Sequence, residues 1–367
     1  MTMKITHVAR QFFPAVGGVE NVVFNLARRQ ILSGHQVSVV TLDRVFSDGE
    51  KLSKHDELSG IKIQRIPFWG SRRYPIAPAV LRHIGDSDII HIHCVDFFVD
   101  FLVLMKWRHG KKIVLHTHGG FFHTKWLIYF KKAYFHIITR MVLKGCTKVI
   151  AVSEGDFKTF SKISPKVMVA ENGVDFEGFS SIRKNIHQGR MVYLGRVDRH
   201  KRVDNLIRVV AELRHRGRKV SLGVYGPEWN NCLPDLQKLA DELKVADFID
   251  WKGKVSDGDI QEALAEAQFF LSASEYEGFG ISAVEAMASG TVCVLNDIES
   301  FRKILGEERQ LLVDFNDTDS SVAAILELMN LTGEQYSALG GSLKSRAKLF
   351  SWESTVEKIE RVYQDCL

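Results

Sequence analysis

The chain has 367 residues, of which 45% are hydrophobic and 25% are charged, and its formal net charge is +5. This length suits two domains of ordinary size, and the composition is typical of a globular protein. No run of 18 apolar residues occurs, and the first residues lack the charged and apolar regions of a secretion signal, so we expect neither a membrane-spanning helix nor export.

Short apolar runs alternate with helical patterns along the whole chain. The expected strands are Lys4–Ala9, Gln36–Thr41, Ile61–Ile66, Ile89–His93, Lys112–His116 and Lys148–Val152 in the first half, and Met191–Leu194, Ser221–Tyr225, Phe248–Lys252, Phe269–Ser272, Val292–Leu295 and Gln310–Val313 in the second. Such alternation predicts parallel sheets covered by helices. A small, polar break near residues 176–188 separates the two sets, as a linker would. We therefore predict an α/β protein with two doubly wound, Rossmann-like domains.

The expected domain boundaries follow from this break. We predict a first domain over residues 1–176, a second over residues 189–348, and a final amphipathic helix over residues 350–367 with Val356 and Ile359 on its apolar side. In open α/β sheets, ligands bind at the carboxyl ends of the strands. The candidate site residues described below all follow such ends.

Two glycines follow the first strand of the chain. Gly17 and Gly18 stand between that strand and a helical pattern, where the lack of side chains lets a ligand approach the backbone closely. The segment is not the Gly-x-Gly-x-x-Gly fingerprint of dinucleotide binding, which argues against a nicotinamide oxidoreductase. A tight turn without a ligand is the alternative.

Two basic residues follow the first strand of the second half. Arg196 comes directly after Gly195, and Lys201 follows five residues later. An arginine can bind a diphosphate through two parallel hydrogen bonds, and a lysine can bind it as a compact charge. The alternative is a solvated basic loop.

The segment from Glu277 to Glu285 is the most informative motif of the chain. A glycine-rich turn follows the strand Phe269–Ser272, and a predicted helix then runs from Ile281 to Ser289 before Gly290 ends it. The first turn of that helix offers free N–H groups to a phosphate, Glu277 can accept hydrogen bonds from sugar hydroxyls, and Glu285 can bind the two hydroxyls of a ribose. The expected donor-binding residues are Gly17, Gly18, Gly278, Phe279, Gly280, Ile281 and Glu285. The motif predicts a nucleotide-diphosphate-sugar as ligand, and solvated glutamates are the alternative.

Five features follow one another along the chain: Gly17–Gly18, His118, Arg196, Lys201 and the Glu277–Glu285 segment. In this order they resemble the motifs of the retaining glycosyltransferases of family 4, and the resemblance covers nearly the whole chain. The resemblance implies the GT-B fold, in which two Rossmann-like domains face a central cleft and a C-terminal helix crosses back to the first domain. It also implies that His118, Glu277, Arg196 and Lys201 act in catalysis. The leaving phosphate of such enzymes takes the acceptor's proton, so no dedicated protein base is required.

Several segments of the first half carry a narrower resemblance. Arg10–Phe12, Thr41–Phe46, Arg73–Pro78 and His116–Thr124 look like those of the mannosyltransferases of xanthan and acetan synthesis. This likeness implies α-1,3 transfer of mannose from GDP-mannose to a polyprenyl-diphosphate-linked glycan in bacterial exopolysaccharide synthesis. The alternative is another donor, such as UDP-glucose or UDP-GlcNAc, with a lipid or lipopolysaccharide acceptor.

We predict no metal and no cofactor. The five cysteines are scattered without a Cys-x-x-Cys pair, which argues against disulfides and a zinc site and favours the cytosol. The sequence Asp86-Ser87-Asp88 favours a solvated strand edge. His91 and His93 share one face of a strand, but no third ligand stands at a matching spacing, so a packed or hydrogen-bonded role is expected.

Positive charge is concentrated in the first half. Residues 1–175 hold 25 basic and 14 acidic residues, a net charge of +11, and the remainder of the chain has −6. Residues 101–153 contain ten basic residues and no acidic one. The residues that we expect to bind the anionic inner face of the cell membrane are Phe122, Lys125, Trp126, Lys131 and Lys132. Aromatic residues in a core beneath a solvated basic face are the alternative.

Two other classes of function remain open. The basic stretch would attract nucleic acid, but no helix-turn-helix or zinc pattern accompanies it, so we expect no nucleic-acid partner. A protein that binds a nucleotide-sugar without catalysing its transfer would show the same motifs.

Overall fold

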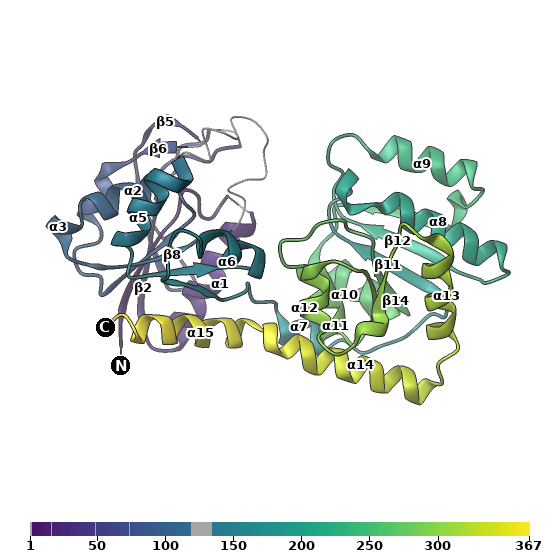
Figure 1. Cartoon of the computed structure of the whole chain (residues 1–367). Helices are drawn as coiled ribbons and strands as arrows, with labels where there is room; N and C mark the ends of the chain where they lie inside the picture. Colours follow the sequence, from purple (N-terminus) through teal and green to yellow (C-terminus); the bar gives the residue numbers. More distant parts are fainter. Residues whose placement is uncertain (1, 16, 48, 73, 119–133) are drawn as a thin grey trace. The chain divides into compact units, whose positions relative to one another are not determined.

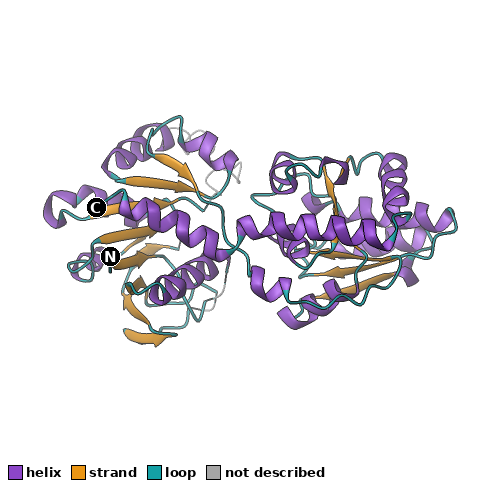
Figure 2. Ribbon diagram, turned by 90° about the horizontal axis from the view of Figure 1, so that it is seen from below, coloured by secondary structure: helices purple, strands orange, loops and turns teal. Residues whose placement is uncertain are grey.

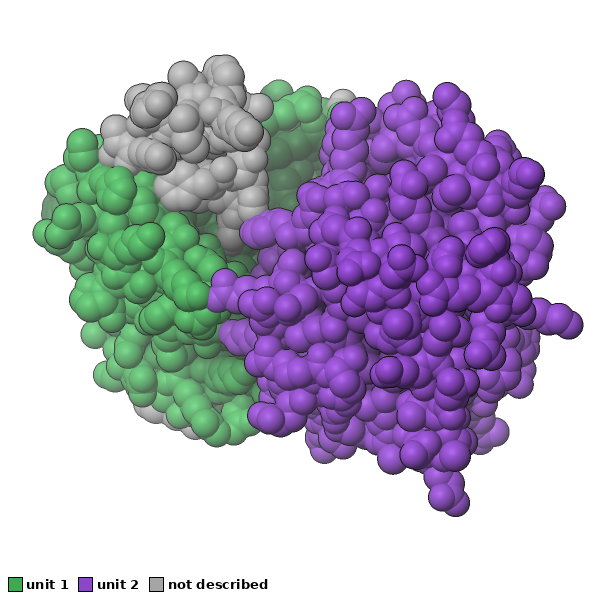
Figure 3. Space-filling view, turned by 45° about the vertical axis from the view of Figure 1, so that its right-hand side comes forward, with its two compact units in different colours: residues 1–173, 352–367 green, residues 174–351 purple. Residues whose placement is uncertain are grey.

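The computed structural model describes residues 2–15, 17–47, 49–72, 74–118 and 134–367. The chain forms two compact units (Figures 1 and 3). Unit 1 comprises Met1–Gly173 and Trp352–Leu367, and unit 2 comprises Val174–Ser351.

The sheet of unit 1 has eight strands in the order β10-β9-β8-β7-β1-β2-β4-β3. The strands are β1 (Lys4–Val8), β2 (Gln36–Leu42), β3 (His55–Leu58), β4 (Ile61–Ile66), β7 (Ile89–His93), β8 (Lys112–His116), β9 (Lys148–Ala151) and β10 (Val167–Val169). All neighbouring pairs are parallel except β3 and β4. The six strands expected here are confirmed to within one residue at each end.

Helices cover both faces of this sheet (Figures 1 and 2). They are α1 (Gly18–Leu32), α2 (Phe97–Leu104), α3 (Lys106–His109), α5 (Arg140–Gly145), α6 (Glu154–Phe160) and α15 (Trp352–Gln364), with short helices η1 (Pro78–Arg82) and η2 (Phe135–Thr139) and a separate hairpin of β5 (Trp69–Ser71) and β6 (Tyr74–Ile76). One core forms where Leu26 of α1 and Ile359 of α15 pack with the sheet residue Val39. The other forms around Phe98 of α2 and Leu143 of α5.

Unit 2 has six parallel strands in the order β13-β12-β11-β14-β15-β16. They are β11 (Arg190–Leu194), β12 (Ser221–Tyr225), β13 (Ile249–Gly253), β14 (Phe269–Ser272), β15 (Val292–Asn296) and β16 (Leu312–Val313). The helices are α7 (Phe176–Ser180), η3 (Arg199–Lys201), α8 (Val203–His215), α9 (Leu233–Glu242), η4 (Ala246–Phe248), α10 (Asp257–Glu266), α11 (Ile281–Ala288), α12 (Glu299–Leu305), η5 (Arg309–Leu311), α13 (Thr318–Met329), α14 (Gly333–Ala347) and η6 (Lys348–Phe350). The expected strands are confirmed with small shifts, and the helix that begins at Ile281 ends before Gly290, which has φ +75°.

In both sheets the strand order reverses at one point, which is where open α/β sheets bind ligands. The reversal lies between β1 and β7 in unit 1 and between β11 and β14 in unit 2. The loops after β11 and β14 contain Lys201 and Glu277. The predicted donor residues of unit 2 therefore lie at its switch point.

The stretch near residues 176–188 was expected to be a linker, and its beginning differs from that expectation. It starts with α7, whose Phe179 is buried in the core of unit 2. The Asp175 side chain caps this helix by accepting a hydrogen bond from the Gly178 N–H at 3.2 Å. Polar and glycine residues here cap a helix, which explains why their composition looks like that of a linker.

None of the helices in the described residues has the length and apolar character that a membrane crossing requires.

Candidate active site

Two glycine turns shape the carboxyl edge of the unit 2 sheet. Gly195 ends β11 with φ +149°, and Gly226 ends β12 with φ +142°. A Cβ atom on Gly226 would lie 2.0 Å from the carbonyl oxygen of Gly195. The two turns therefore meet backbone to backbone, which only glycine permits at this position.

Arg196 leaves the β11 turn as an exposed side chain. Its guanidinium group lies over the ring of Trp229, with Cζ 5.2 Å from the ring centroid. Among the described residues no carboxylate lies within ion-pair distance of Arg196. This arrangement leaves its N–H groups available to an anion such as a diphosphate.

Lys201 joins the loop after β11 to the loop after β14. Its Nζ donates to Oε1 of Glu277 at 2.6 Å, and the Ser274 hydroxyl donates to the same oxygen at 2.9 Å. The Lys201 and Glu277 side chains are only 13% and 15% exposed. The structure thus brings together two of the predicted catalytic residues, with Lys201 held by one carboxylate oxygen of Glu277.

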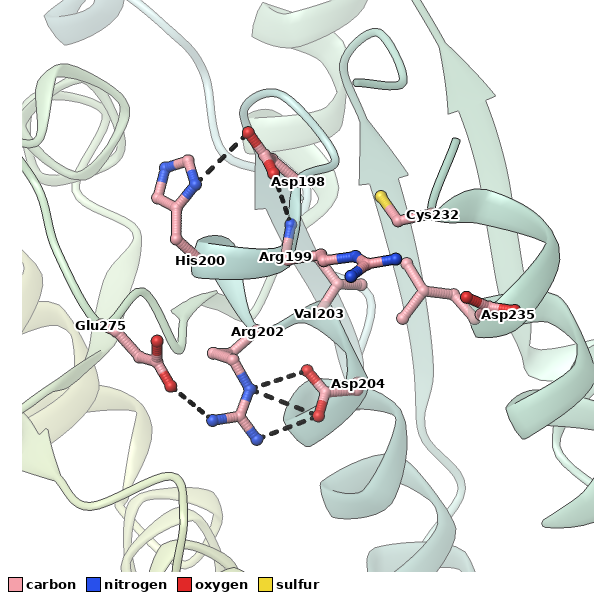
Figure 4. Close-up of a pocket in the computed structure, with 10 residues that line it drawn as sticks. Asp198, Arg199, His200, Arg202, Val203, Asp204, Cys232, Asp235 and Glu275 are labelled. Atoms are coloured by element: carbon pink, nitrogen blue, oxygen red, sulfur yellow. Dashed lines mark hydrogen bonds and ion pairs between the residues drawn. The ribbon is translucent and has the colours of Figure 1, made fainter. Parts of the chain in front are cut away.

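The neighbouring residues of the same loop line a pocket in Figure 4. Arg202, in the left-handed conformation with φ +51°, donates to Asp204 and to Glu275. The lining does not include Arg196, Lys201 or Glu277. Arg202 therefore holds the loop through two carboxylates, and its charge is compensated within the protein.

The glycine-rich turn leads into α11 as expected, but one predicted ligand residue points elsewhere. The Phe279 side chain is buried and packs edge-on against Phe350, with ring centroids 5.4 Å apart. Gly280 has φ +97°, and a Cβ there would lie 2.9 Å from the ring of Phe301. Phe279 thus anchors the turn in the core, so any donor contact of this residue must come from its backbone.

The start of α11 is open. Its first residue, Ile281, is exposed, and no side chain caps the first turn. A Cβ atom on Gly278 would meet no atom within 4 Å. The N–H groups of the first turn and the positive end of the helix dipole can therefore bind a phosphate.

Glu285 lies two turns into α11 and is partly buried. Burial raises its pKa to about 8, and the nearby charges of Asp257 and Asp175 raise it further. The unliganded carboxyl group is therefore mostly protonated at neutral pH.

In unit 1, Gly17 caps α1 in an extended conformation and Gly18 begins the helix. A Cβ atom on Gly17 would lie 2.5 Å from Oε2 of Glu20, whereas one on Gly18 would meet nothing within 4 Å. The lack of a side chain at Gly17 makes room for the Glu20 carboxylate, whose pKa is raised by burial. Gly18 leaves the space in front of the helix open.

His118 follows β8 with φ +54°, an unusual conformation for a residue other than glycine. Its Nε2 lies 2.7 Å from Nδ1 of His93, and Nε2 of His93 lies 2.9 Å from Nδ1 of His7. Burial lowers the pKa of His118 to about 3 and that of His7 to about 4. These imidazoles are therefore neutral at physiological pH.

His118 belongs to a cluster of five histidines that sequence analysis did not find. The cluster comprises His7, His91, His93, His116 and His118. Nitrogens of His7, His91 and His93 lie within 4.8 Å of one another, and so do those of His93, His116 and His118. The packed and hydrogen-bonded role expected for His91 and His93 is confirmed, but the histidines that surround them were not expected from sequence spacing. The missing signal was strand register, because His7 pairs with His91 and His93 pairs with His116 on neighbouring strands.

The cluster's geometry favours hydrogen bonding over metal binding. The rings of His91 and His93 stack with centroids 4.4 Å apart, and those of His116 and His118 stack at 4.2 Å. Metal ligands instead aim their lone pairs at one point. Both nitrogens of His7 and of His93 are used in hydrogen bonds. The absence of a metal requirement stays a prediction.

Of two other sequence predictions, the structure describes only one. Asp88 accepts a hydrogen bond from the Lys4 N–H at 2.8 Å, and the Ser87 hydroxyl contacts that of Thr6 at 2.6 Å, so the Asp-x-Asp segment has structural partners. The predicted membrane-binding residues Phe122, Lys125, Trp126, Lys131 and Lys132 lie outside the described residues.

Comparisons with known proteins match both halves of the chain. Residues 16–177 match the model described as Glycosyltransferase Family 4, and residues 176–344 match that described as Glycosyl transferases group 1. The GDP-mannose:cellobiosyl-diphosphopolyprenol alpha-mannosyltransferase of Xanthomonas oryzae pv. oryzae is 35% identical over 100% of this chain and 97% of its own length. The enzyme of the same name from Xanthomonas campestris is 38% identical over 90% of this chain and 88% of its own.

Solved structures share the fold at low sequence identity. A glycosyltransferase from Rickettsia africae has a TM-score of 0.76 at 19% identity and covers 100% of this chain and 98% of its own. Sucrose-phosphate synthase from Thermosynechococcus elongatus has a TM-score of 0.75 at 17% identity and covers 99% and 98%. These likenesses confirm the GT-B fold. Together with the full-length sequence matches, they show that the chain belongs to the glycosyltransferases of family 4.

Proposed function

We propose that the protein transfers α-mannose from GDP-mannose to a cellobiosyl-diphosphopolyprenol acceptor in exopolysaccharide synthesis. The observation that carries the proposal is the likeness to mannosyltransferases with this printed name from three organisms, at 34–38% identity over 90–100% of this chain. The mannose of GDP-mannose is α-linked, and the relatives are named α-mannosyltransferases, so the proposed transfer retains the configuration at the anomeric carbon.

The residues of unit 2 fit the donor that this reaction requires. When the bond between mannose and the β-phosphate breaks, negative charge grows on the diphosphate. Arg196, whose guanidinium stacks over Trp229 and pairs with no carboxylate of the described residues, Lys201 and the open N-terminus of α11 can stabilise this charge. The bond electrons go to the leaving phosphate, which takes the proton of the acceptor hydroxyl, and the hydroxyl oxygen bonds to the sugar.

Glu277 has two roles in this proposal. Its Oε1 holds Lys201 and accepts from Ser274, which fixes the carboxylate. Its Oε2 takes part in neither contact and can accept a hydrogen bond from a hydroxyl of the donor sugar. His118 is retained as the catalytic candidate of unit 1 on the family resemblance.

Glu285 is proposed to bind the ribose. An ionised carboxylate offers both oxygens as acceptors to neighbouring hydroxyls, whereas the protonated acid uses one oxygen as a donor. Because burial raises its pKa to about 8, binding a diol as the carboxylate requires Glu285 to lose its proton.

A donor screen tests the function. The purified protein is incubated with a short-chain cellobiosyl-diphosphate lipid and GDP-mannose, UDP-glucose or UDP-GlcNAc in turn, and products are identified by mass spectrometry. We expect one hexose to be added from GDP-mannose alone. Transfer from a UDP-sugar in the absence of transfer from GDP-mannose would refute the proposed donor.

The Lys201–Glu277 pair predicts a kinetic effect. Glu277→Ala removes the group that positions Lys201 and is expected to lower kcat about 100-fold, as loss of a preorganised charge-stabilising contact does in other enzymes. The matched control is Glu275→Ala, two residues earlier, which removes an exposed carboxylate paired with Arg202. Its kcat should stay near that of the wild type. Equal kcat values for the two variants would contradict the role of Glu277.

Glu285 predicts a pH dependence of stability. Its folded-state pKa of about 8 lies above the ordinary value of 4.5, so its stabilising effect is complete below pH 4.5 and is lost as the pH rises through 8. Relative to Glu285→Gln, the wild-type free energy of unfolding should fall by at most about 1.4 kcal/mol per pH unit across this range. Urea denaturation of both proteins at intervals between pH 4.5 and 8 measures this difference. If the difference in free energy of unfolding between the two proteins did not change with pH, a protonated Glu285 in the folded protein would be ruled out.

Association with a membrane completes the proposal, because a polyprenyl acceptor resides in one. The support is the basic stretch 101–153, which has ten basic and no acidic residues. We propose that Phe122, Lys125, Trp126, Lys131 and Lys132 bind the anionic inner face of the cell membrane. Changing the three lysines together to glutamate should reduce sedimentation with anionic liposomes at low salt and leave GDP binding unchanged. Equal sedimentation of variant and wild type would exclude this surface.

A further inference from the structure

A continuous chain of hydrogen bonds links α15 to His118 within unit 1. Nε2 of Gln30 donates to the Tyr363 hydroxyl at 3.1 Å, and Oε1 of Gln30 lies 2.7 Å from Nε2 of His7. The chain continues from Nδ1 of His7 to His93 at 2.9 Å and from His93 to His118 at 2.7 Å. Tyr363, Gln30, His7 and His93 are each at most 1% exposed. These contacts are therefore shielded from bulk water.

The amide of Gln30 gives the chain a direction. An amide oxygen only accepts, so His7 must carry its proton on Nε2, and its Nδ1 must then accept. His93 therefore donates from Nε2 and accepts at Nδ1, which requires His118 to donate from Nε2. In each neutral ring the second nitrogen has no proton. Nδ1 of His118 is consequently an acceptor.

Tyr363 determines which way the Gln30 amide faces. Its hydroxyl accepts from the Gln30 amide nitrogen and lies 2.5 Å from Nδ1 of His91, so its own hydrogen is left for that nitrogen. With its hydrogen directed at His91, Tyr363 offers Gln30 an acceptor, so the amide oxygen is left for His7. A residue of the last helix thus fixes the proton position of a residue that follows β8.

The His118 end of this hydrogen-bond chain has features of a functional site. His118 has φ +54°, and Cys94, which follows the neighbouring strand, has φ +78°. Such strained conformations cluster where ligands bind. A pocket of about 150 Å³ is lined by His93, the ring hydrogen-bonded to His118, by Cys94 and by polar side chains that include Arg10 and Glu20, whereas His118 is not part of its lining. Among the described residues, Nδ1 of His118 has no hydrogen-bond partner, so a ligand can use it.

We propose that Gln30 and Tyr363 are positioning residues that keep the proton of His118 on Nε2, so that Nδ1 accepts a hydrogen bond from a hydroxyl of a bound sugar. The identity of the ligand as a sugar rests on the proposed function. A phosphate oxygen is itself an acceptor and cannot donate to Nδ1. The hydrogen-bond chain thus favours a hydroxyl over an unprotonated phosphate as the partner of His118.

The test combines histidine ¹⁵N NMR with kinetics. In the wild type, the His118 spectrum, assigned with a His118→Gln variant, should show a protonated Nε2 and an unprotonated Nδ1. Gln30→Met keeps the side-chain length but removes the acceptor, and Tyr363→Phe keeps the ring but frees the amide. Both should shift the His118 signals toward a mixture of the two forms and lower kcat about tenfold or more, within the range of proton-positioning effects. The affinity for GDP should not change.

The matched control is Thr355→Val on the same helix. It removes a buried hydroxyl that donates to the Glu171 carbonyl at 3.1 Å and takes no part in the chain. This variant should leave the His118 signals and kcat unchanged. The proposal would be overturned if His118 of the wild type carried its proton on Nδ1. It would also be overturned if the Gln30→Met variant folded and kept the His118 signals and kcat of the wild type. A stoichiometric metal ion found by elemental analysis on these histidines would overturn it as well. If the wild type transfers no mannose, the proposed function fails, while the NMR measurement still decides the proton position.

Discussion

The geometry of the unit 2 site depends on the ion pair between Lys201 and Glu277. It joins the loops after β11 and β14, which flank the point where the strand order reverses. Both side chains are mostly buried, so water screens the pair less than a surface pair, and loss of one partner leaves the other's charge uncompensated. A backbone hydrogen bond of 2.9 Å from the Glu275 N–H to the His200 carbonyl ties the same loops together. A carboxylate fixed in this way has little freedom left to lose when a sugar binds, which is the advantage of a preorganised site.

The regular part of the fold was predictable because central strands of parallel sheets are buried on both faces. Such strands form short, nearly continuous apolar runs, and Phe269–Ser272 and Val292–Asn296 are fully buried examples. Two of the elements that escaped prediction lack this signal. β3 has the sequence His-Asp-Glu-Leu and lies exposed at the antiparallel edge of its sheet, while β5 is exposed throughout. Each of these strands pairs with the next strand along the chain, and this pairing does not require burial of the strand's own side chains.

The candidate site was predictable in part, for a related reason. Residues in loops directly after strands can be assigned to the carboxyl edge from local sequence alone, which located Arg196, Lys201 and Glu277. The direction of a side chain cannot be assigned in this way, and Phe279 illustrates the difference, since its ring packs on Phe350. The histidine cluster was beyond local reasoning, because His7 and His91 are 84 residues apart and meet only through the parallel register of β1 and β7.

The two units use titratable groups in opposite ways. At the unit 2 site the buried charges of Lys201 and Glu277 compensate each other, whereas unit 1 buries five imidazoles whose pKa values are lowered, so that they stay neutral. Burial of these five imidazoles costs free energy of folding. Among the described residues, Nε2 of His91 and both nitrogens of His116 are buried without a hydrogen-bond partner, and each such atom opposes folding. Apolar side chains at these strand positions would avoid the cost. The proton order imposed on His118 explains why His7 and His93 are retained in the sheet interior, and His91 supports it through Tyr363, whereas His116 has no part in this hydrogen-bond chain.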